Sequence, residues 1–332
     1  MEEIQNNNIC ERAMDYADKV SSVNPICNFW MRILAFSIDM IILSIPVNIA
    51  AFIFQSQLAR MGGWERLVGF VAVVVYFGIL NSHFTNGQTF GKKVTRIRVV
   101  NINGKSISIG KSFFRAAILA IPLFLNGARI PPRILVSPLG VIISGIVFGG
   151  IIGIIYFYVF NRATRQSLHD IITKTIVIKT QEHDEIRLVP IARIHYAIYG
   201  VVVFCVLTIS AFAFTSATKK QDFRELIELQ RQICNIRHVS YTGVFVGKTF
   251  GQEKDMQYLK VVIFWTGNPD SSFLAEKKAA EVIFNTYPHI ENKDQIGIIT
   301  VYGYDIGLGG LWWTKPNWKS PEQWREELNE QK

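Results

Sequence analysis

The sequence predicts an α-helical polytopic membrane bundle of about five spans, with a small cytoplasmic β-hairpin element and a C-terminal soluble α+β domain. Apolar residues make up 49% of the 332 residues and charged residues only 18%, against about 25% charge in an ordinary soluble domain. Residues 1–215 hold 20 Lys and Arg against 11 Asp and Glu, whereas residues 216–332 hold 15 of each. This distribution excludes a wholly soluble enzyme, a disordered protein and a nucleic-acid-binding protein with a basic face along the whole chain.

Five segments are apolar enough to be predicted as membrane spans. They are residues 30–55, 64–84, 112–128, 134–161 and 190–218. A helix needs about 20 apolar residues to cross the ~30 Å hydrocarbon layer, and the third segment is the short one. By length alone, its apolar run 116–128 also fits a re-entrant or interfacial segment. Residues 1–29 lack the pattern of a cleaved signal peptide and are predicted to be a cytoplasmic tail.

The basic residues predict the orientation. Loops 85–111 and 162–193 carry six Lys or Arg each, while the turns 56–66 and 129–133 carry two each. Short loops rich in Lys and Arg stay on the cytoplasmic side. Segment 112–128 must then cross the membrane, and the fifth span carries residues 219–332 to the extracytoplasmic side. The prediction is a multi-pass integral membrane protein with its N-terminus in the cytoplasm.

The first basic loop also has a β-strand pattern. Residues 94–100 and 106–109 alternate in polarity about Asn103-Gly104, a strong hairpin signal. Residues 173–179 (TKTIVIK) alternate in the same way and are expected to add a third strand. The alternative is a pair of basic amphipathic loops that lie on anionic lipid.

Asp39 is the most informative residue of the first span. A carboxylate near the centre of a span costs ~2.5–3.5 kcal/mol on insertion scales, so it faces the bundle interior, pairs, or handles ions. Arg32 lies on the same helical face, about 10.5 Å nearer the cytoplasm, which is too far for a direct ion pair with Asp39. Asp170, just after the fourth span, is the expected partner of Arg32. Two interpretations stay open: a structural clamp, and ion or proton handling at Asp39.

Three segments carry a family resemblance. Residues 32–39 (RILAFSID), 87–92 (GQTFGK) and 165–170 (RQSLHD) occur in the order found in the RDD family of membrane proteins, which they resemble. Besides the arginine and two aspartates that name the family, the matching positions are Gly87, Gln88, Thr89, Gly91, Lys92, Arg165 and His169. The resemblance covers residues 25–180 and leaves residues 190–332 unaccounted for.

The resemblance implies a charge cluster of Arg32, Asp39 and Asp170. For function it implies little, because cation/proton antiport has been suggested for some relatives and assembly of complexes for others.

Two chemical interpretations of these segments are rejected. Residues 87–92 imitate a phosphate-binding loop, but only three residues separate the glycines, and Lys93 stands where a Ser or Thr is needed. A tight turn is the better interpretation. The pair His169-Asp170 suggests the His/Asp dyad of a phosphohydrolase, but the sequence has no second His/Asp set at ligand spacing. We therefore interpret His169 as an interfacial histidine. Neither a metal nor a cofactor is predicted.

Gly145, Gly149 and Gly153 recur every four residues in the fourth predicted span. Such a face lets another helix approach closely. The sequence does not decide between packing inside the bundle and self-association of the protein.

Residues 219–332 show the order helix, two strands, helix, two strands, helix, which predicts a small α+β domain. They contain no catalytic set and no metal-ligand pattern. Trp312, Trp313 and Trp318 are interpreted as core residues, a binding surface or a bilayer contact.

The leading functional hypothesis is therefore a non-enzymatic scaffold or regulator that displays this C-terminal domain. Its expected partners are the lipid bilayer and an unknown protein, without nucleic acid. The rival hypothesis is a monovalent cation/proton antiporter that uses Asp39.

Overall fold

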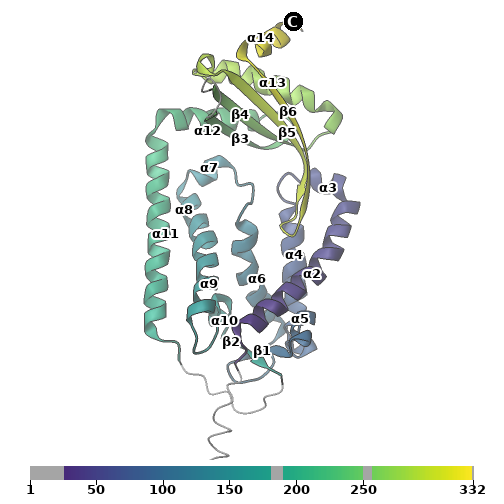
Figure 1. The fold of residues 1–332 in the computed structure, drawn as a ribbon, viewed down its shortest axis with the longest axis vertical. Coiled ribbons are helices and arrows are strands. Elements are labelled where there is room, and N and C mark those ends of the chain that lie inside the picture. The colour runs from purple at the N-terminus through teal and green to yellow at the C-terminus, as the bar shows by residue number, and fades with distance from the viewer. Residues whose placement is uncertain (1–25, 181–189, 250–255, 331–332) are drawn as a thin grey trace, which may run out of the picture.

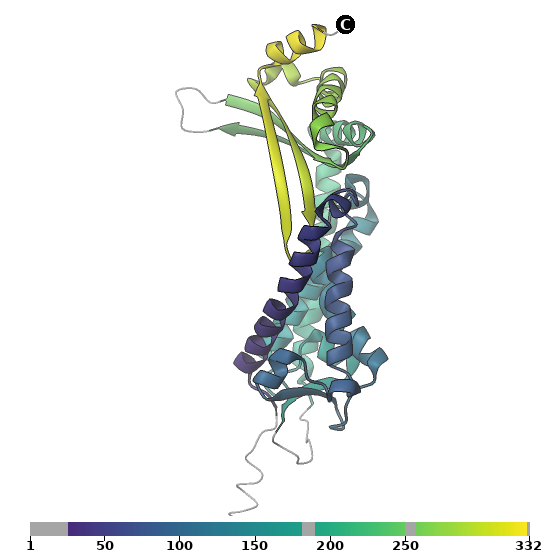
Figure 2. The same cartoon turned by 90° about the vertical axis from the view of Figure 1, so that its right-hand side faces the viewer.

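The computed structural model describes residues 26–180, 190–249 and 256–330. The predicted tail 1–29 falls largely outside the described residues. Long apolar helices lie side by side, with a small sheet at one end and a larger sheet covered by helices at the other (Figures 1 and 2). We call the end that holds the small sheet the basic end, because the described residues of both basic loops lie there.

Three helices of the described chain are long and apolar enough to cross a membrane. They are α2 (Phe29–Ile53), the continuous helix Pro138–Phe160 and α11 (Arg193–Lys219). Helix α4 (Arg66–Leu80) and the segment His83–Val94 form a pair bent by 59°, which raises the number to four if the pair is one span. These helices make the chain an integral membrane protein. The count of five spans stays a prediction, because α6 (Ile109–Leu125) has only 17 residues.

Shorter elements complete the membrane part. They are α3 (Gln55–Ala59), η1 (His83–Thr85), α5 (Phe90–Val94), α7 (Pro132–Leu135) and α10 (Leu168–Thr173). The helix Pro138–Phe160 consists of α8 (Pro138–Ser144), a π-helical turn η2 (Gly145–Gly149) and α9 (Gly150–Phe160).

The small sheet at the basic end corrects the hairpin prediction. Strand β1 (Ile97–Asn101) pairs antiparallel with β2 (Thr175–Lys179), so its partner comes from the second basic loop. The expected strand 106–109 does not form, because the Ser108 hydroxyl accepts the amide of Lys111 and so begins α6. Strand formation near 173–179 is confirmed, and the pairing places both basic loops at one end of the bundle.

The glycine face of the fourth predicted span packs against α11. A Cβ added at Gly153 would lie 2.6 Å from the Tyr199 ring, and one at Gly145 would lie 2.7 Å from Leu207. The Tyr199 hydroxyl also donates to the Gly149 carbonyl at 3.1 Å. These contacts support packing inside the bundle, and self-association through this face stays a prediction.

The C-terminal domain has the predicted order of elements. They are α12 (Gln221–Cys234), β3 (Val239–Thr249), β4 (Met256–Trp265), α13 (Ser272–Thr286), β5 (Gln295–Asp305), β6 (Gly310–Lys319) and α14 (Pro321–Asn329), with the short turns η3 (Pro269–Ser271) and η4 (Ile290–Asn292). The sheet order is β3-β4-β5-β6, in which only β4 and β5 run parallel. Leu229, Leu259 and Ile283 belong to the core between the sheet and its helices.

The core interpretation of the three tryptophans is wrong. Trp312, Trp313 and Trp318 lie on β6 and are 37%, 47% and 41% exposed. As the outer strand of the sheet, β6 leaves one side of these rings open to the surroundings, while each ring still contacts one aromatic side chain of the sheet: Phe264, Tyr302 and Tyr258, respectively. The interpretations as a binding surface or a bilayer contact remain.

The hairpin formed by β5 and β6 extends beyond its domain to the membrane helices (Figures 1 and 2). We call residues 305–310 the hairpin tip. Its Ile306 is fully buried in one cluster with Ala51 and Leu58, and Asn48 of α2 donates to the Leu308 carbonyl at 3.3 Å. The hairpin tip therefore packs against α2 and α3 towards the end of the bundle opposite the basic end.

Candidate functional site

A buried ion cluster joins three helices at the basic end. Asp170 of α10 is fully buried between Arg32 of α2 and Arg115 of α6. Arg32 Nη2 lies 2.5 Å from Asp170 Oδ2, and Arg115 Nη2 lies 2.6 Å from Asp170 Oδ1. The expected contact of Arg32 with Asp170 is present. Sequence reasoning missed Arg115, although a lone arginine next to an apolar run was the available signal.

His169 extends this cluster in its neutral form. The Arg115 guanidinium only donates, so its 3.0 Å contact makes His169 Nε2 the acceptor and places the ring proton on Nδ1. Burial lowers the pKa of His169 to about 3; Asp170 opposes that shift and Arg115 adds to it. Burial alone would raise the pKa of Asp170, but Arg115 and Arg32 outweigh burial and hold that pKa well below its usual range.

Asp39 belongs to a separate set of contacts. Its carboxylate accepts hydrogen bonds from the Tyr76 hydroxyl at 2.8 Å, the Thr89 hydroxyl at 2.5 Å and the Gly91 amide at 2.8 Å. Asp39 is fully buried and has no ion pair among the described residues. Arg32 and Asp39 therefore fix α2 to two different elements: Arg32 to α10 and Asp39 to α5.

Residues 87–92 form the predicted tight turn, which is followed by a short helix that was not predicted. Gly87 has φ +74°, and its carbonyl accepts the Val99 amide at 2.9 Å. The next residue, Gln88, donates to the Ile97 carbonyl at 3.0 Å. The turn is thereby joined to β1.

The second half of the same segment brings α5 against α2. The Thr89 hydroxyl accepts the amide of Lys92 and caps α5. A Cβ at Gly91 would lie only 2.0 Å from the Ala35 carbonyl, so only glycine permits this approach. The ammonium of Lys92 donates to the side-chain oxygen of buried Asn81.

Residues 165–170 supply a carbonyl and a carboxylate that contact the Arg32 guanidinium. Arg165 has φ +52°, which turns its carbonyl toward the Arg32 guanidinium as an acceptor. Ser167 and Asp170 form a capping box at the start of α10. That arrangement fixes the Asp170 carboxylate between the two arginines.

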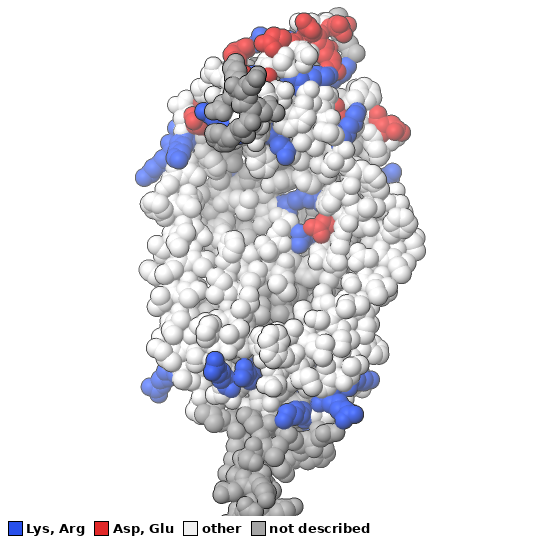
Figure 3. Space-filling view, in the orientation of Figure 1, with Lys and Arg blue, Asp and Glu red and all other residues white. Residues whose placement is uncertain are grey.

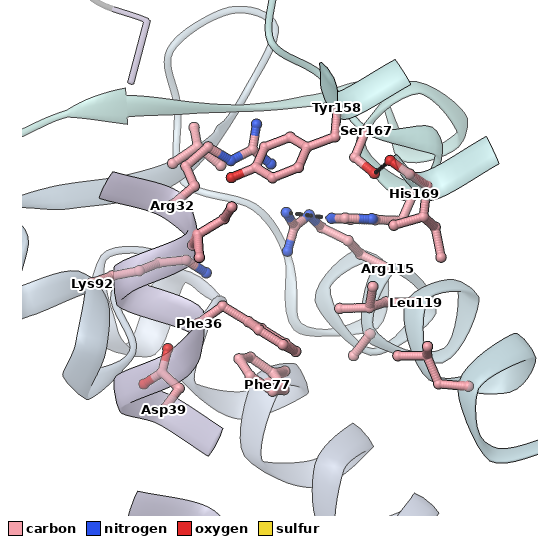
Figure 4. Close-up of a pocket in the computed structure, with 15 residues that line it drawn as sticks. Arg32, Phe36, Asp39, Phe77, Lys92, Arg115, Leu119, Tyr158, Ser167 and His169 are labelled. Carbon is pink, nitrogen blue, oxygen red and sulfur yellow. Dashed lines mark hydrogen bonds between the residues drawn. The ribbon is translucent and has the colours of Figure 1, made fainter. Parts of the chain in front are cut away.

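A pocket of about 270 Å³ lies beside these groups (Figure 4). Arg32, Lys92 and Arg115 line it together with apolar side chains of α2, α4 and α6. The sequence-predicted site residues Arg32, Asp39, Lys92 and His169 thus share one pocket. Gly145, Gly149 and Gly153 do not line it.

A second group of charges lies at the opposite end of the bundle. Arg66 Nη1 lies 2.8 Å from Asp305 Oδ2 of the hairpin tip, and Arg129 pairs with buried Glu65. Figure 3 shows a few charges in a hollow within the largely uncharged middle of the molecule. The Arg66–Asp305 pair spans 239 residues of sequence, and no sequence pattern marked it.

One group of potential metal ligands lies in the C-terminal domain. Asp222, Glu225 and His289 offer ligand atoms that lie within 4.8 Å of one another. Exposed acidic side chains often cluster in this way without a metal, and Asp222 is exposed.

Comparison with known proteins gives a family match for the first part of the chain. The RDD family model matches residues 26–174. A protein of Bacillus subtilis (strain 168) described as uncharacterized protein YxaI is 29% identical over 171 residues, which is 45% of this chain and 95% of that protein. No solved structure matches the chain. Residues 26–174, which include Arg32, Asp39 and Asp170, therefore form a membrane domain of the RDD family.

Proposed function

We propose that the protein is a non-enzymatic, membrane-embedded scaffold or regulator that holds its C-terminal α+β domain on the extracytoplasmic side. RDD membership and the apolar helices support the membrane part of this proposal. The two basic loops lie at one end of the bundle and the C-terminal domain at the other. The positive-inside rule then assigns the C-terminal domain to the outside.

The observation that carries the proposal is the insertion of the hairpin tip between the membrane helices. A domain on a flexible tether has no need of such a contact. Here the Arg66–Asp305 ion pair and the apolar cluster around Ile306 fix the domain to α2, α3 and α4. A partner that binds the C-terminal domain would therefore be held in a defined position above the bundle, and a shift of either part would affect the other.

We expect Gly69→Ala to detach the hairpin tip from α4. The added Cβ would lie 1.9 Å from the Ile306 carbonyl, whereas alanine favours the helix itself by about 1 kcal/mol. The measurement is hydrogen exchange of the amides of residues 306–310 together with thermal unfolding. Exchange should accelerate, and we expect one unfolding transition in the wild type but two in the variant.

Gly200→Ala is the matched control, because nothing lies within 4 Å of a Cβ at Gly200 of α11. Equal exchange at the hairpin tip in the two variants would contradict a rigid connection.

We expect Asp39→Asn to lower stability, and we expect no cation-dependent proton flux in either the wild type or this variant. The amide group would face three hydrogen-bond donors that the carboxylate now satisfies, and a buried donor without a partner costs about 1–3 kcal/mol. The measurement is monovalent-cation-dependent proton flux in sealed vesicles, at matched protein levels, alongside thermal unfolding.

Flux in the wild type that disappears in a stable Asp39→Asn protein would replace the scaffold by an antiporter. The contacts of Asp39 give no support to that alternative, because both carboxylate oxygens are occupied by donors of the protein.

A further inference from the structure

The pocket at the basic end has a polar end and an apolar end. Figure 4 shows nitrogen atoms of Arg32, Lys92 and Arg115 around one part of the pocket, with the rings of Phe36 and Phe77 beyond them. The pocket has a volume of about 270 Å³, close to the lower limit for small-molecule sites.

The charges that line the pocket do not balance within the protein. The single negative charge of Asp170 neutralises only one of the two arginines that line the pocket, Arg32 and Arg115, and His169 is neutral. The carboxylate of Asp39 offsets a second positive charge only from a distance, since neutral groups supply its hydrogen bonds.

Lys92 is the charge left over. It is 9% exposed and donates to neutral Asn81, and no ion pair of Lys92 is found in the described part of the chain. Burial and then the positive charge of Arg115 lower the pKa of Lys92 well below its usual value, because burying an ammonium without a counter-ion is costly. An anion from outside the chain would lower that cost.

The order of charged and apolar side chains along two helices indicates which kind of anion fits the pocket. On α2, Phe36 follows Arg32 by about one turn, and on α6, Leu123 lies roughly 12 Å beyond Arg115. In both helices the cation is nearer the basic end and the apolar side chain lies deeper in the bundle. An amphiphile in the leaflet on the basic side has the same order, with its charged headgroup at the surface and its hydrocarbon chain inward.

The pocket is also reachable from the side of the bundle. Phe36 and Leu123 line the pocket and are still 39% and 43% exposed, which places them at a lateral rim that lipid chains contact. A soluble anion would need no apolar rim.

We propose that this pocket binds the phosphate headgroup of an anionic membrane lipid near Arg32, Lys92 and Arg115, with the start of one acyl chain against Phe36, Leu119 and Leu123. The site is independent of what the C-terminal domain does. It gives the basic end a preference among lipids, so the bundle is most stable in an anionic leaflet.

The test uses the full chain, purified in an uncharged detergent and stripped of lipid. Phosphatidylglycerol, phosphatidylcholine and inorganic phosphate are added separately, and bound lipid is counted by native mass spectrometry beside the shift in unfolding temperature. Phosphatidylglycerol should remain bound at one copy and raise the unfolding temperature, while phosphatidylcholine should do neither. An equal shift with inorganic phosphate would show a site for free anions and overturn the lipid assignment.

Leu119→Trp fills the apolar part of the pocket and keeps all three cations. Ile121→Trp is its matched control, because Ile121 is on the same helix, is 39% exposed and does not line the pocket. Retention of phosphatidylglycerol should fall at least tenfold in Leu119→Trp and stay at the wild-type level in Ile121→Trp. Equal retention in both variants would overturn the proposal, since it would assign the binding to the basic loops in general.

Discussion

Replacement of Asp170 by asparagine is expected to lower the stability of the protein by about 3–5 kcal/mol, the usual cost of removing one member of a buried ion pair. Asparagine keeps the shape of the side chain and can still accept a hydrogen bond, so the loss reports the charge. Arg32 and Arg115 would then face each other across a buried site that has no anion from the protein. Thermal unfolding in detergent measures the effect.

An exposed pair provides the control for that experiment. Glu228 and Arg231 are three residues apart on α12, and their side chains are 42% and 63% exposed. Solvent screens such pairs, so Glu228→Gln is expected to change stability by less than about 1 kcal/mol. If Asp170→Asn unfolded at the same temperature as Glu228→Gln, the cluster would not hold the three helices together.

Gly91→Ala is expected to have the second large effect, a loss of about 3 kcal/mol or more. The new Cβ would lie 2.0 Å from the Ala35 carbonyl, a backbone atom that cannot turn away. Helix α5 would have to move off α2, which combines the cost of overpacking with the loss of the Gly91 amide bond to Asp39.

Gly110→Ala separates this steric effect from the general effect of adding a methyl group to a helix. Gly110 lies at the start of α6 with nothing within 4 Å of an added Cβ. We expect its alanine variant to be as stable as the wild type or slightly more stable. Unfolding temperatures of the two variants compared side by side give the answer, and similar values would contradict a close contact of α5 with α2.

Several features of the basic end were predictable because the signals are local. Helical geometry separates Arg32 from Asp39, and the position of Asp170 just after the fourth predicted span indicated it as the partner of Arg32. The turn at Gly87 follows from the need for glycine at positive φ. The order of elements in the C-terminal domain was predictable for the same reason, since each helix and strand has its own polarity pattern.

The features that were missed depend on contacts between distant segments. Asn103-Gly104 forms a turn whichever strand pairs with β1, so the local pattern could not identify β2 as the partner. A lone arginine next to an apolar run indicates that Arg115 needs a partner, but its sequence neighbours do not identify α10 as the element that provides it. The exposed tryptophans of β6 also looked like core residues, because composition alone does not tell an outer strand from a central one.

The hairpin tip has a consequence for the way the chain is made. Arg66 and Asp305 are 239 residues apart, so the hairpin tip can pack against α2, α3 and α4 only after the last strands have been synthesised. At about 5–20 residues per second, the interval is roughly 12–50 s. For that time the apolar surface around Ala51 and Leu58 lacks its native cover and is open to chaperones and proteases. A chain that stops after α11 would keep this surface exposed.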